Sequence, residues 1–149
     1  MNPQQIRPIV ICVLRDGDRM LVAEYHHPVD GTPYYRPMGG GIEFGERSQE
    51  CIVREMREEI GAEIEDLHYL GVIENLYSEG GKPYHQIVLI YEARLADPRL
   101  YKVSTVKSQV EEFSVAVWKP MDEFRTGKAR VYPHGLLELV DKSGERSES

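Results

Sequence analysis

The chain has 149 residues, of which 41% are apolar and 29% are charged, and its net charge is −7. This composition is ordinary for a globular protein, and it excludes a largely disordered, collagen-like or low-complexity chain. No apolar run approaches the roughly 20 residues of a membrane helix, and the first residues lack the basic and apolar segments of a signal peptide. We therefore expect one cytoplasmic domain over residues 1–142, followed by a disordered tail over residues 143–149.

The elements expected along the chain are typical of a mixed sheet flanked by helices. Strands are expected at residues 9–14, 20–23 and 34–36, the first two joined by a tight turn and the third stopped by Pro37 and the glycines at 39–41. A helix is expected over 48–60, with Gly61 as its C-cap. Strands follow at 67–76 and 85–95, then a loop over 97–110, a strand over 113–118, and helical segments opened by Pro120 and Pro133.

The acidic residues are concentrated in one stretch of the chain. Residues 39–66 contain nine acids and three arginines, a local charge of −6. An acidic chain has no general attraction for nucleic acid, so we expect no role in coating DNA or RNA. A dense group of carboxylates favours a bound cation, although a solvated acidic surface explains the same pattern.

The two cysteines, Cys12 and Cys51, both lie in apolar-rich segments and show no metal-ligand spacing. This placement indicates buried thiols in a reducing compartment rather than a disulfide.

The expected helix over residues 48–60 carries three carboxylates on one face. Because about 3.6 residues make a helical turn, Glu55, Glu58 and Glu59 share about one third of its surface, beside the apolar stripe. Like charges at this spacing each destabilise a helix by a few tenths of a kcal/mol. No lysine is interleaved with them, so the face favours binding of a hard divalent cation through oxygen ligands.

The residues around this helix resemble a family motif. Gly40, then five residues, Glu46, then seven residues and the run from Arg54 to Ala62 (REMREEIGA) are similar to the Nudix box, G-x5-E-x7-R-E-U-x-E-E-x-G-U, with U aliphatic. All seven fixed residues match, and only the small Ala62 departs from the pattern. The resemblance implies an α/β fold, the Nudix α/β/α sandwich with a mixed β-sheet flanked by helices.

The resemblance also implies a metal site. Glu55, Glu58 and Glu59 would bind Mg²⁺ or Mn²⁺ together with Gly40, where the absence of a side chain lets the backbone turn tightly beside bound phosphates. The implied reaction is hydrolysis of the diphosphate linkage of a nucleoside diphosphate derivative to a nucleoside monophosphate and a phosphorylated product. A carboxylate among like charges has a raised pKa, which suits a general base, and both Glu58 and Glu59 are candidates.

Residues outside the carboxylate face have expected roles as well. By resemblance, Arg54 would pair with Glu46 and hold the loop against the helix rather than contact substrate. Gly61 would support the site by ending the helix. A further acid often precedes the last strand in such enzymes, and Glu111 and Glu112 stand there. We prefer Glu112 as a catalytic residue, with a charge that only guards the strand end as the alternative.

Substrate selection falls to residues outside the motif. Arg36 is expected to contact phosphate, although an exposed strand charge is an equal alternative. Four tyrosines at loops or strand ends can stack a base, namely Tyr34, Tyr35, Tyr77 and Tyr84. Of these we assign Tyr35 and Tyr77 to the substrate. The position of Pro83 differs from that of the proline in ADP-ribose-cleaving relatives, which argues weakly against ADP-ribose and leaves the substrate open.

Three classes of function remain from the sequence. The first is the metal-dependent hydrolase, the second a catalytically silent nucleotide-sensing module on the same fold, and the third a structural domain that binds a basic partner. A silent module is expected to lack one of the motif glutamates, and none is missing. We expect a small-molecule nucleotide as partner and no membrane, with a homodimer left open.

Overall fold

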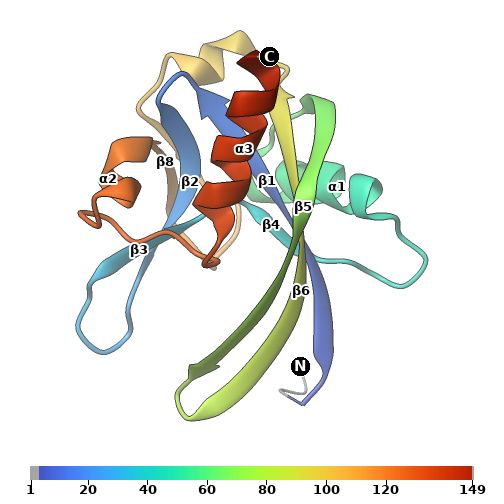
Figure 1. The fold of residues 1–149 in the computed structure, drawn as a ribbon, viewed down its shortest axis with the longest axis vertical. Helices are drawn as coiled ribbons and strands as arrows, with labels where there is room; N and C mark the ends of the chain where they lie inside the picture. The colour runs from blue at the N-terminus through green and yellow to red at the C-terminus, as the bar shows by residue number, and fades with distance from the viewer. Residues whose placement is uncertain (1–3, 149) are drawn as a thin grey trace.

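The computed structural model describes residues 4–148, with side chains described through residue 143 (Figure 1). The strands are β1 (Ile6–Asp16), β2 (Arg19–His26), β3 (Pro33–Arg36), β4 (Gly39–Gly41), β5 (Ile64–Glu79), β6 (Lys82–Leu95), β7 (Thr105–Lys107) and β8 (Val115–Pro120). The helices are α1 (Ser48–Ile60), α2 (Met121–Arg125) and α3 (Leu136–Glu148), with a 3₁₀ turn, η1 (Pro98–Tyr101). The sheet has the strand order β5-β6-β1-β2-β8-β7, and β4 pairs with β1 and β3 with β2.

Strand β1 lies at the centre of the sheet because it is apolar on both faces. Its even-numbered residues from Val10 to Leu14 face one core, its odd-numbered residues from Ile9 to Val13 face the other, and all are buried. Strand β6 runs parallel to β1, whereas the other named strand pairs are antiparallel. The sheet is therefore mixed, as the sequence predicted.

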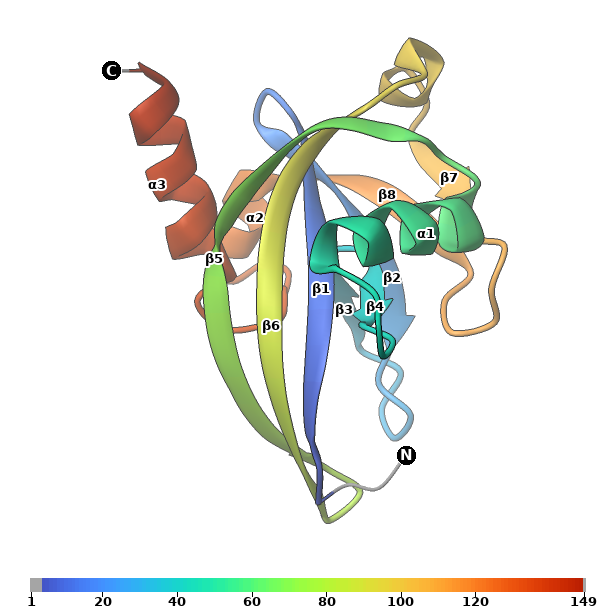
Figure 2. The ribbon, with the colours of Figure 1, turned by 90° about the vertical axis from the view of Figure 1, so that its right-hand side faces the viewer.

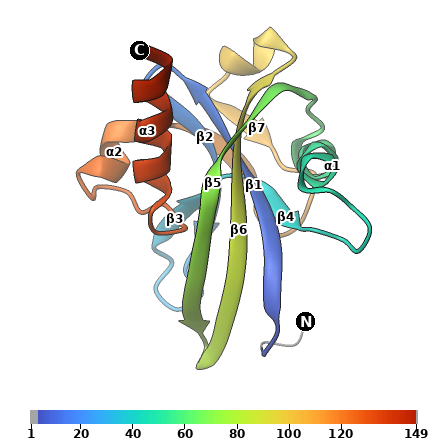
Figure 3. The ribbon, with the colours of Figure 1, turned by 45° about the vertical axis from the view of Figure 1, so that its right-hand side comes forward.

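Helices cover both faces of this sheet. Helix α1 lies on one face, while α2 and α3 lie on the other (Figures 2 and 3). Ile52 and Met56 of α1 are buried in the core that contains Val10, and Leu136 and Val140 of α3 are buried in the core that contains Ile9. The predicted α/β/α sandwich is confirmed.

The two halves of the sheet diverge below the β1–β2 hairpin. Strands β1 and β2 pair only where Arg15 is opposite Met20 and Asp16 is opposite Arg19. Further along, β1 pairs with β4 and β2 pairs with β3. This change of partners separates β3 from β1 and β6, and the candidate site lies in that region.

The glycine run differs from the sequence prediction. The glycines at 39–41 were expected to stop a strand, with a tight backbone turn at Gly40, but Gly39–Gly41 forms β4, antiparallel to β1. A Cβ added at Gly39 would lie 2.0 Å from the carbonyl oxygen of Val10, so the backbones approach too closely for a side chain. Sequence patterns miss such a strand because it carries no side chains to alternate.

One further segment is more ordered than predicted. The expected loop over residues 97–110 contains η1 and β7, and β7 pairs with β8. Helix α3 is described as far as Glu148, within the segment over which we expected a disordered tail, and Ser149 lies outside the described residues. The first turns of α3 pack on the sheet through Leu136 and Val140.

Cys12 and Cys51 are free and buried, as predicted. Among the described helices, none is both long enough and apolar enough to cross a membrane.

Candidate active site

A bidentate ion pair fixes the loop after β4 to helix α1. The Arg54 Nε donates to Glu46 Oε2 at 2.7 Å, and one terminal nitrogen of Arg54 donates to Glu46 Oε1 at 3.0 Å. This contact lowers the pKa of Glu46 to about 2, chiefly because the guanidinium hydrogen-bonds the charged carboxylate. The pairing expected from the sequence is therefore present.

The rest of the Arg54 guanidinium is also occupied by protein groups. Its other terminal nitrogen lies 3.1 Å from Glu55 and 3.2 Å from Glu58. The nitrogen that contacts Glu46 also lies 3.4 Å from the carbonyl oxygen of Gly41. With every nitrogen engaged, Arg54 acts as a clamp between β4, the loop and α1, and it has no free donor for a substrate.

Glu59 and Glu55 form a carboxyl pair under β4. Glu59 is buried, at 8% exposure, and its carboxyl group hydrogen-bonds that of Glu55. Burial, followed by this bond and the charge of Glu55, raises the pKa of Glu59 to about 8, against smaller opposing effects of the Gly39 amide and the Arg36 charge. Two carboxyl groups this close share a proton when no cation neutralises them.

Gly40 is the backbone position that meets this pair. A Cβ added there would lie 2.6 Å from the carboxyl group of Glu55, so only glycine leaves the carboxylate room against β4. Oxygen donors of this kind suit a hard divalent cation, which would replace the shared proton between Glu55 and Glu59. The residues present therefore fit Mg²⁺ or Mn²⁺.

Glu58 is placed apart from the buried pair. Its side chain is 54% exposed and is paired with Arg54 rather than with Glu55 or Glu59. In the part of the chain that the structure describes, no three His, Cys, Asp or Glu side chains lie close enough together to hold a metal ion. A third carboxylate ligand at Glu58 would require its side chain to turn away from Arg54.

The loop before β8 lies over the C-terminal end of α1. The backbone N–H of Gln109 donates to the backbone carbonyl oxygen of Glu59 at 2.7 Å. A Cβ added at Gly61 would lie 2.5 Å from the side-chain nitrogen of Gln109. Gly61 adopts the left-handed C-cap that the sequence predicted, with φ of 64°. The helix end and the loop therefore support each other through these two residues.

The same loop brings Glu112 toward the site, with Tyr25 as the link. Burial is the main cause that raises the pKa of Tyr25, and the charges of Glu59 and Glu112 add smaller upward effects against that of Arg36. Phe113 contacts the Tyr25 ring at 5.8 Å between centroids. Arg36 lies over that ring at 5.5 Å. Tyr25 was not singled out from the sequence, and only the pairing of β2 with β3 signals its position. Glu111, the alternative to Glu112, is exposed, as is Glu112 itself, but its charge does not act on Tyr25.

A cavity of about 530 Å³ opens beside Arg36, between β3 and the β5–β6 hairpin, and we call it the β3–β5 cavity. Ile9 and Val88 line it, together with Tyr34 and Arg36 of β3 and Tyr77 of β5. Its size is within the range of small-molecule sites. The structure thus brings Arg36 and Tyr77 together at one cavity, as the sequence predictions for substrate require.

Tyr35 does not belong to this cavity, which corrects its assignment to the substrate. Its ring is 4% exposed and packs against Phe124, with Lys119 over its face at 4.9 Å. Adjacent side chains of a strand point to opposite faces, so Tyr34 and Arg36 line the cavity while Tyr35 enters the core.

Three arginines near the β3–β5 cavity lack a carboxylate partner within the described residues. Arg36 and Arg130 line the cavity, and Arg7 lies against Gly41, where a Cβ would meet its guanidinium at 2.8 Å. Burial raises the pKa of Tyr77, and the charge of Arg7 is among the smaller effects that oppose this rise, so Arg7 lies within reach of the cavity wall. Unpaired cations at one place in an acidic chain favour an anionic ligand.

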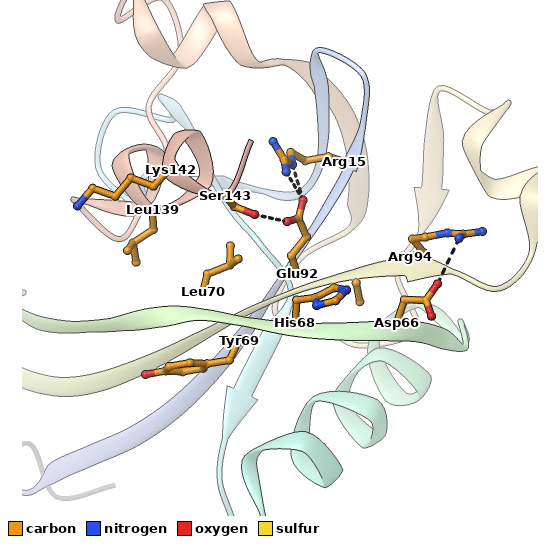
Figure 4. Close-up of a pocket in the computed structure, with 11 residues that line it drawn as sticks. Arg15, Asp66, His68, Tyr69, Leu70, Glu92, Arg94, Leu139, Lys142 and Ser143 are labelled. Carbon is orange, nitrogen blue, oxygen red and sulfur yellow. Dashed lines mark hydrogen bonds and ion pairs between the residues drawn. The ribbon is translucent and has the colours of Figure 1, made fainter. Parts of the chain in front are cut away.

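A second cavity, of about 750 Å³, lies between α3 and the strands β5 and β6, and we call it the α3 cavity (Figure 4). Its arginines are already neutralised: Arg15 pairs with Glu92 at 2.5 Å, and Arg94 pairs with Asp66 at 3.2 Å. Ser143 of α3 donates to the other Glu92 oxygen at 2.8 Å. None of the residues predicted for the site lines this cavity, whereas Arg36 and Tyr77 line the β3–β5 cavity, which is therefore the candidate substrate cavity. The motif glutamates line neither cavity.

Known proteins with similar sequences point to the same family as the motif. A family model described as NUDIX domain matches residues 5–138. A protein of Pseudomonas aeruginosa described as NAD-capped RNA hydrolase NudC is 30% identical over 118 residues, which are 79% of this chain and 37% of that protein. The NudC protein of Photobacterium profundum is 29% identical over 136 residues, 91% of this chain and 44% of its own length. The chain spans less than half the length of these relatives.

Solved structures share the fold. A NUDIX hydrolase from Nitrosomonas europaea has a TM-score of 0.64 at 18% identity, over 95% of this chain and 90% of that one. The NUDIX domain of Shewanella oneidensis NrtR, in complex with ADP ribose, also has a TM-score of 0.64 at 18% identity, over 96% and 89% of the two chains.

Proposed function

Because the chain belongs to the Nudix family, we propose that it hydrolyses the diphosphate linkage of a nucleoside diphosphate derivative. The products are a nucleoside monophosphate and a second phosphorylated compound. The observation that carries this proposal is the Glu55–Glu59 carboxyl pair, which lies against Gly40 beside the Arg54 clamp and within reach of the unpaired charge of Arg36. Carboxylates at one end and unpaired arginine at the other suit a cation-bound diphosphate.

Mg²⁺ or Mn²⁺ is the proposed cofactor. Glu55 and Glu59 would hold it with the backbone at Gly40, and Glu58 would join them from the edge of the site. Such a cation, when bound, neutralises phosphate charge and lowers the pKa of a coordinated water. The Arg54–Glu46 contact keeps the ligands in place, because a bidentate pair fixes orientation as well as distance.

The other residues have proposed roles around this centre. Arg36 binds a phosphate oxygen, and Tyr77 contacts the nucleoside. Glu58 or Glu59 accepts a proton from the attacking water, since both follow the motif and lie on one side of α1. Glu112 is proposed as an additional acid or base, because its loop is fastened to Glu59 through Gln109.

The substrate class is tested with a panel of diphosphates. The panel includes NAD, because the NudC relatives are described as NAD-capped RNA hydrolases, and ADP-ribose, because the NrtR domain was solved with it. Incubation with Mg²⁺ or Mn²⁺ should release a nucleoside monophosphate from at least one compound. In ¹⁸O-labelled water, one phosphate product should carry the label.

Two results would contradict this proposal. Label in a base or sugar would indicate different chemistry. Binding of panel members without any cleavage would instead favour the silent nucleotide-sensing module.

A further inference from the structure

A hydrogen-bonded amide pair, of a buried Gln86 and a half-buried Asn75, lies in the wall of the β3–β5 cavity. Gln86 of β6 is 7% exposed, although Val88 and Ile90 on the same face of its strand are apolar and buried. Its side-chain oxygen accepts a hydrogen bond from Asn75 at 3.1 Å, and Gln86 is directly opposite Asn75 in the β5–β6 register. Burying an amide is unfavourable unless its hydrogen bonds are made, so this pair is a specific feature of the wall.

The amide pair ends at the hydroxyl of Tyr77. Gln86 donates from its side-chain nitrogen to the Tyr77 oxygen at 3.3 Å. Tyr77 is 36% exposed, and one face of its ring stacks on Tyr84, with 5.0 Å between centroids and 14° between planes. The relay from Asn75 through Gln86 thus fixes the hydroxyl of a partly exposed ring at the cavity wall, while Tyr84 supports one ring face.

A second tyrosine is supported in the same way on the β3 side of the cavity. Tyr34 stacks on Tyr25, with 5.3 Å between centroids and 16° between planes, and the edge of Tyr132 contacts it at 5.8 Å. Burial is the main cause that raises the pKa of both Tyr34 and Tyr77, with a smaller opposing effect of the Arg36 charge and a further rise from Glu79 in each case. The two rings therefore lie within reach of the same two charges.

We propose that the β3–β5 cavity binds the planar base of a nucleotide between Tyr34 and Tyr77, and that the Asn75–Gln86 relay positions the Tyr77 ring. The apolar floor suits a ring face, and Arg36 at the β4 end directs the phosphates toward the carboxyl pair. Gln86 is a positioning residue, since it contacts Tyr77 rather than the cavity ligand. The orientation of the phosphates rests on the proposed function, whereas base binding does not.

Base binding is tested with ligands that have no diphosphate to cleave. Dissociation constants of AMP, GMP and UMP are compared with that of ribose 5-phosphate, which lacks a base. At least one nucleotide should bind more tightly than ribose 5-phosphate, and Tyr77→Leu or Tyr34→Leu should weaken its binding about 5- to 100-fold, the range for one stacked base. The affinity for ribose 5-phosphate should stay unchanged.

Tyr69→Leu is the matched control, because Tyr69 is an exposed tyrosine of the same strand that lines the α3 cavity. It should leave every dissociation constant unchanged. An equal loss in Tyr69→Leu would place the base in the α3 cavity and overturn the proposal. Wild-type protein that binds ribose 5-phosphate as tightly as all three nucleotides would also overturn it.

The relay is tested by a double-mutant cycle between Gln86→Leu and Tyr77→Phe. Both changes remove the same hydrogen bond and keep the ring, so each should weaken nucleotide binding and the double variant should be no weaker than either one. Additive effects, or nucleotide binding unchanged by Gln86→Leu, would overturn the positioning role. If base-dependent binding holds but no diphosphate in the panel is cleaved, only the proposed function fails.

Discussion

Replacing Glu59 with glutamine should remove a pH-dependent loss of stability from the metal-free protein. The folded chain raises the pKa of Glu59 from an ordinary 4.5 to about 8, mainly through burial and then through Glu55. A carboxyl group with a raised pKa binds its proton more tightly in the folded state. Its ionisation therefore destabilises the fold progressively as the pH rises from about 4.5 to 8, and below that window it has no effect.

The magnitude follows from the width of this window. Each pH unit inside it changes the free energy of unfolding by about 1.4 kcal/mol, and the slope levels off near the folded pKa. Between pH 6 and pH 8 the wild-type protein should lose about 2 kcal/mol relative to Glu59→Gln, or about 5–8 °C in melting temperature for a domain of this size. Glutamine keeps a donor for Glu55 and cannot ionise.

The assay is urea unfolding at pH 6, 7 and 8 with a chelator present, in wild type and Glu59→Gln. Glu58→Gln is the matched control, because it removes a carboxylate from the same helix that is exposed rather than buried. The control should keep the wild-type pH slope. An identical slope in wild type and Glu59→Gln would refute the reasoning.

Further predictions concern the metal and its supports. Saturating Mg²⁺ should raise the melting temperature by several degrees, since a cation at a hundredfold excess over its dissociation constant adds about 2.7 kcal/mol, whereas sodium at matched ionic strength should not. Glu59→Gln and Glu58→Gln should each lower turnover about 10²- to 10³-fold on any substrate found, and near wild-type turnover in both would contradict the metal-site assignment. Gly40→Ala should displace Glu55 and abolish the Mg²⁺ response with little loss of stability. Gly39→Ala should instead unfold the chain, because the added Cβ would meet the backbone of β1. Urea unfolding with and without Mg²⁺ distinguishes these two outcomes. Arg54→Lys should cost about 1–2 kcal/mol in the same measurement, because lysine cannot make the bidentate contact, and unchanged stability would contradict the clamp.

Local sequence determined helix α1 and its clamp. The bounds Ser48–Ile60 and the C-cap at Gly61 match the prediction, because the helical period and the terminating glycine are written in neighbouring residues. The Arg54–Glu46 pair was implied by the resemblance, whose motif places seven residues between Glu46 and Arg54. The fold class was equally predictable, because the motif resembled a family with one architecture.

The tertiary structure decided which side chains of α1 and β3 are buried and which are exposed. Glu58 and Glu59 are neighbours in a motif of like charges, yet one is exposed and the other is buried beneath β4. From the sequence we preferred Tyr35 to Tyr34 for the substrate, but the pairing of β3 with β2 places Tyr34 at the cavity and Tyr35 in the core. Side-chain period is a local property, but the identity of the buried face depends on strands that are distant in the chain.

The same reason explains the arginines of the β3–β5 cavity. Arg7, Arg36 and Arg130 come from β1, β3 and the segment after α2, and no sequence spacing relates them. They converge because β1 and β2 stay paired only near their hairpin and then take different partners, which opens the cavity between them. The sequence alone determined which functional groups helix α1 and its loop carry. The pairing of distant strands decided which other residues these groups meet, because strand pairing depends on contacts between residues far apart in the chain.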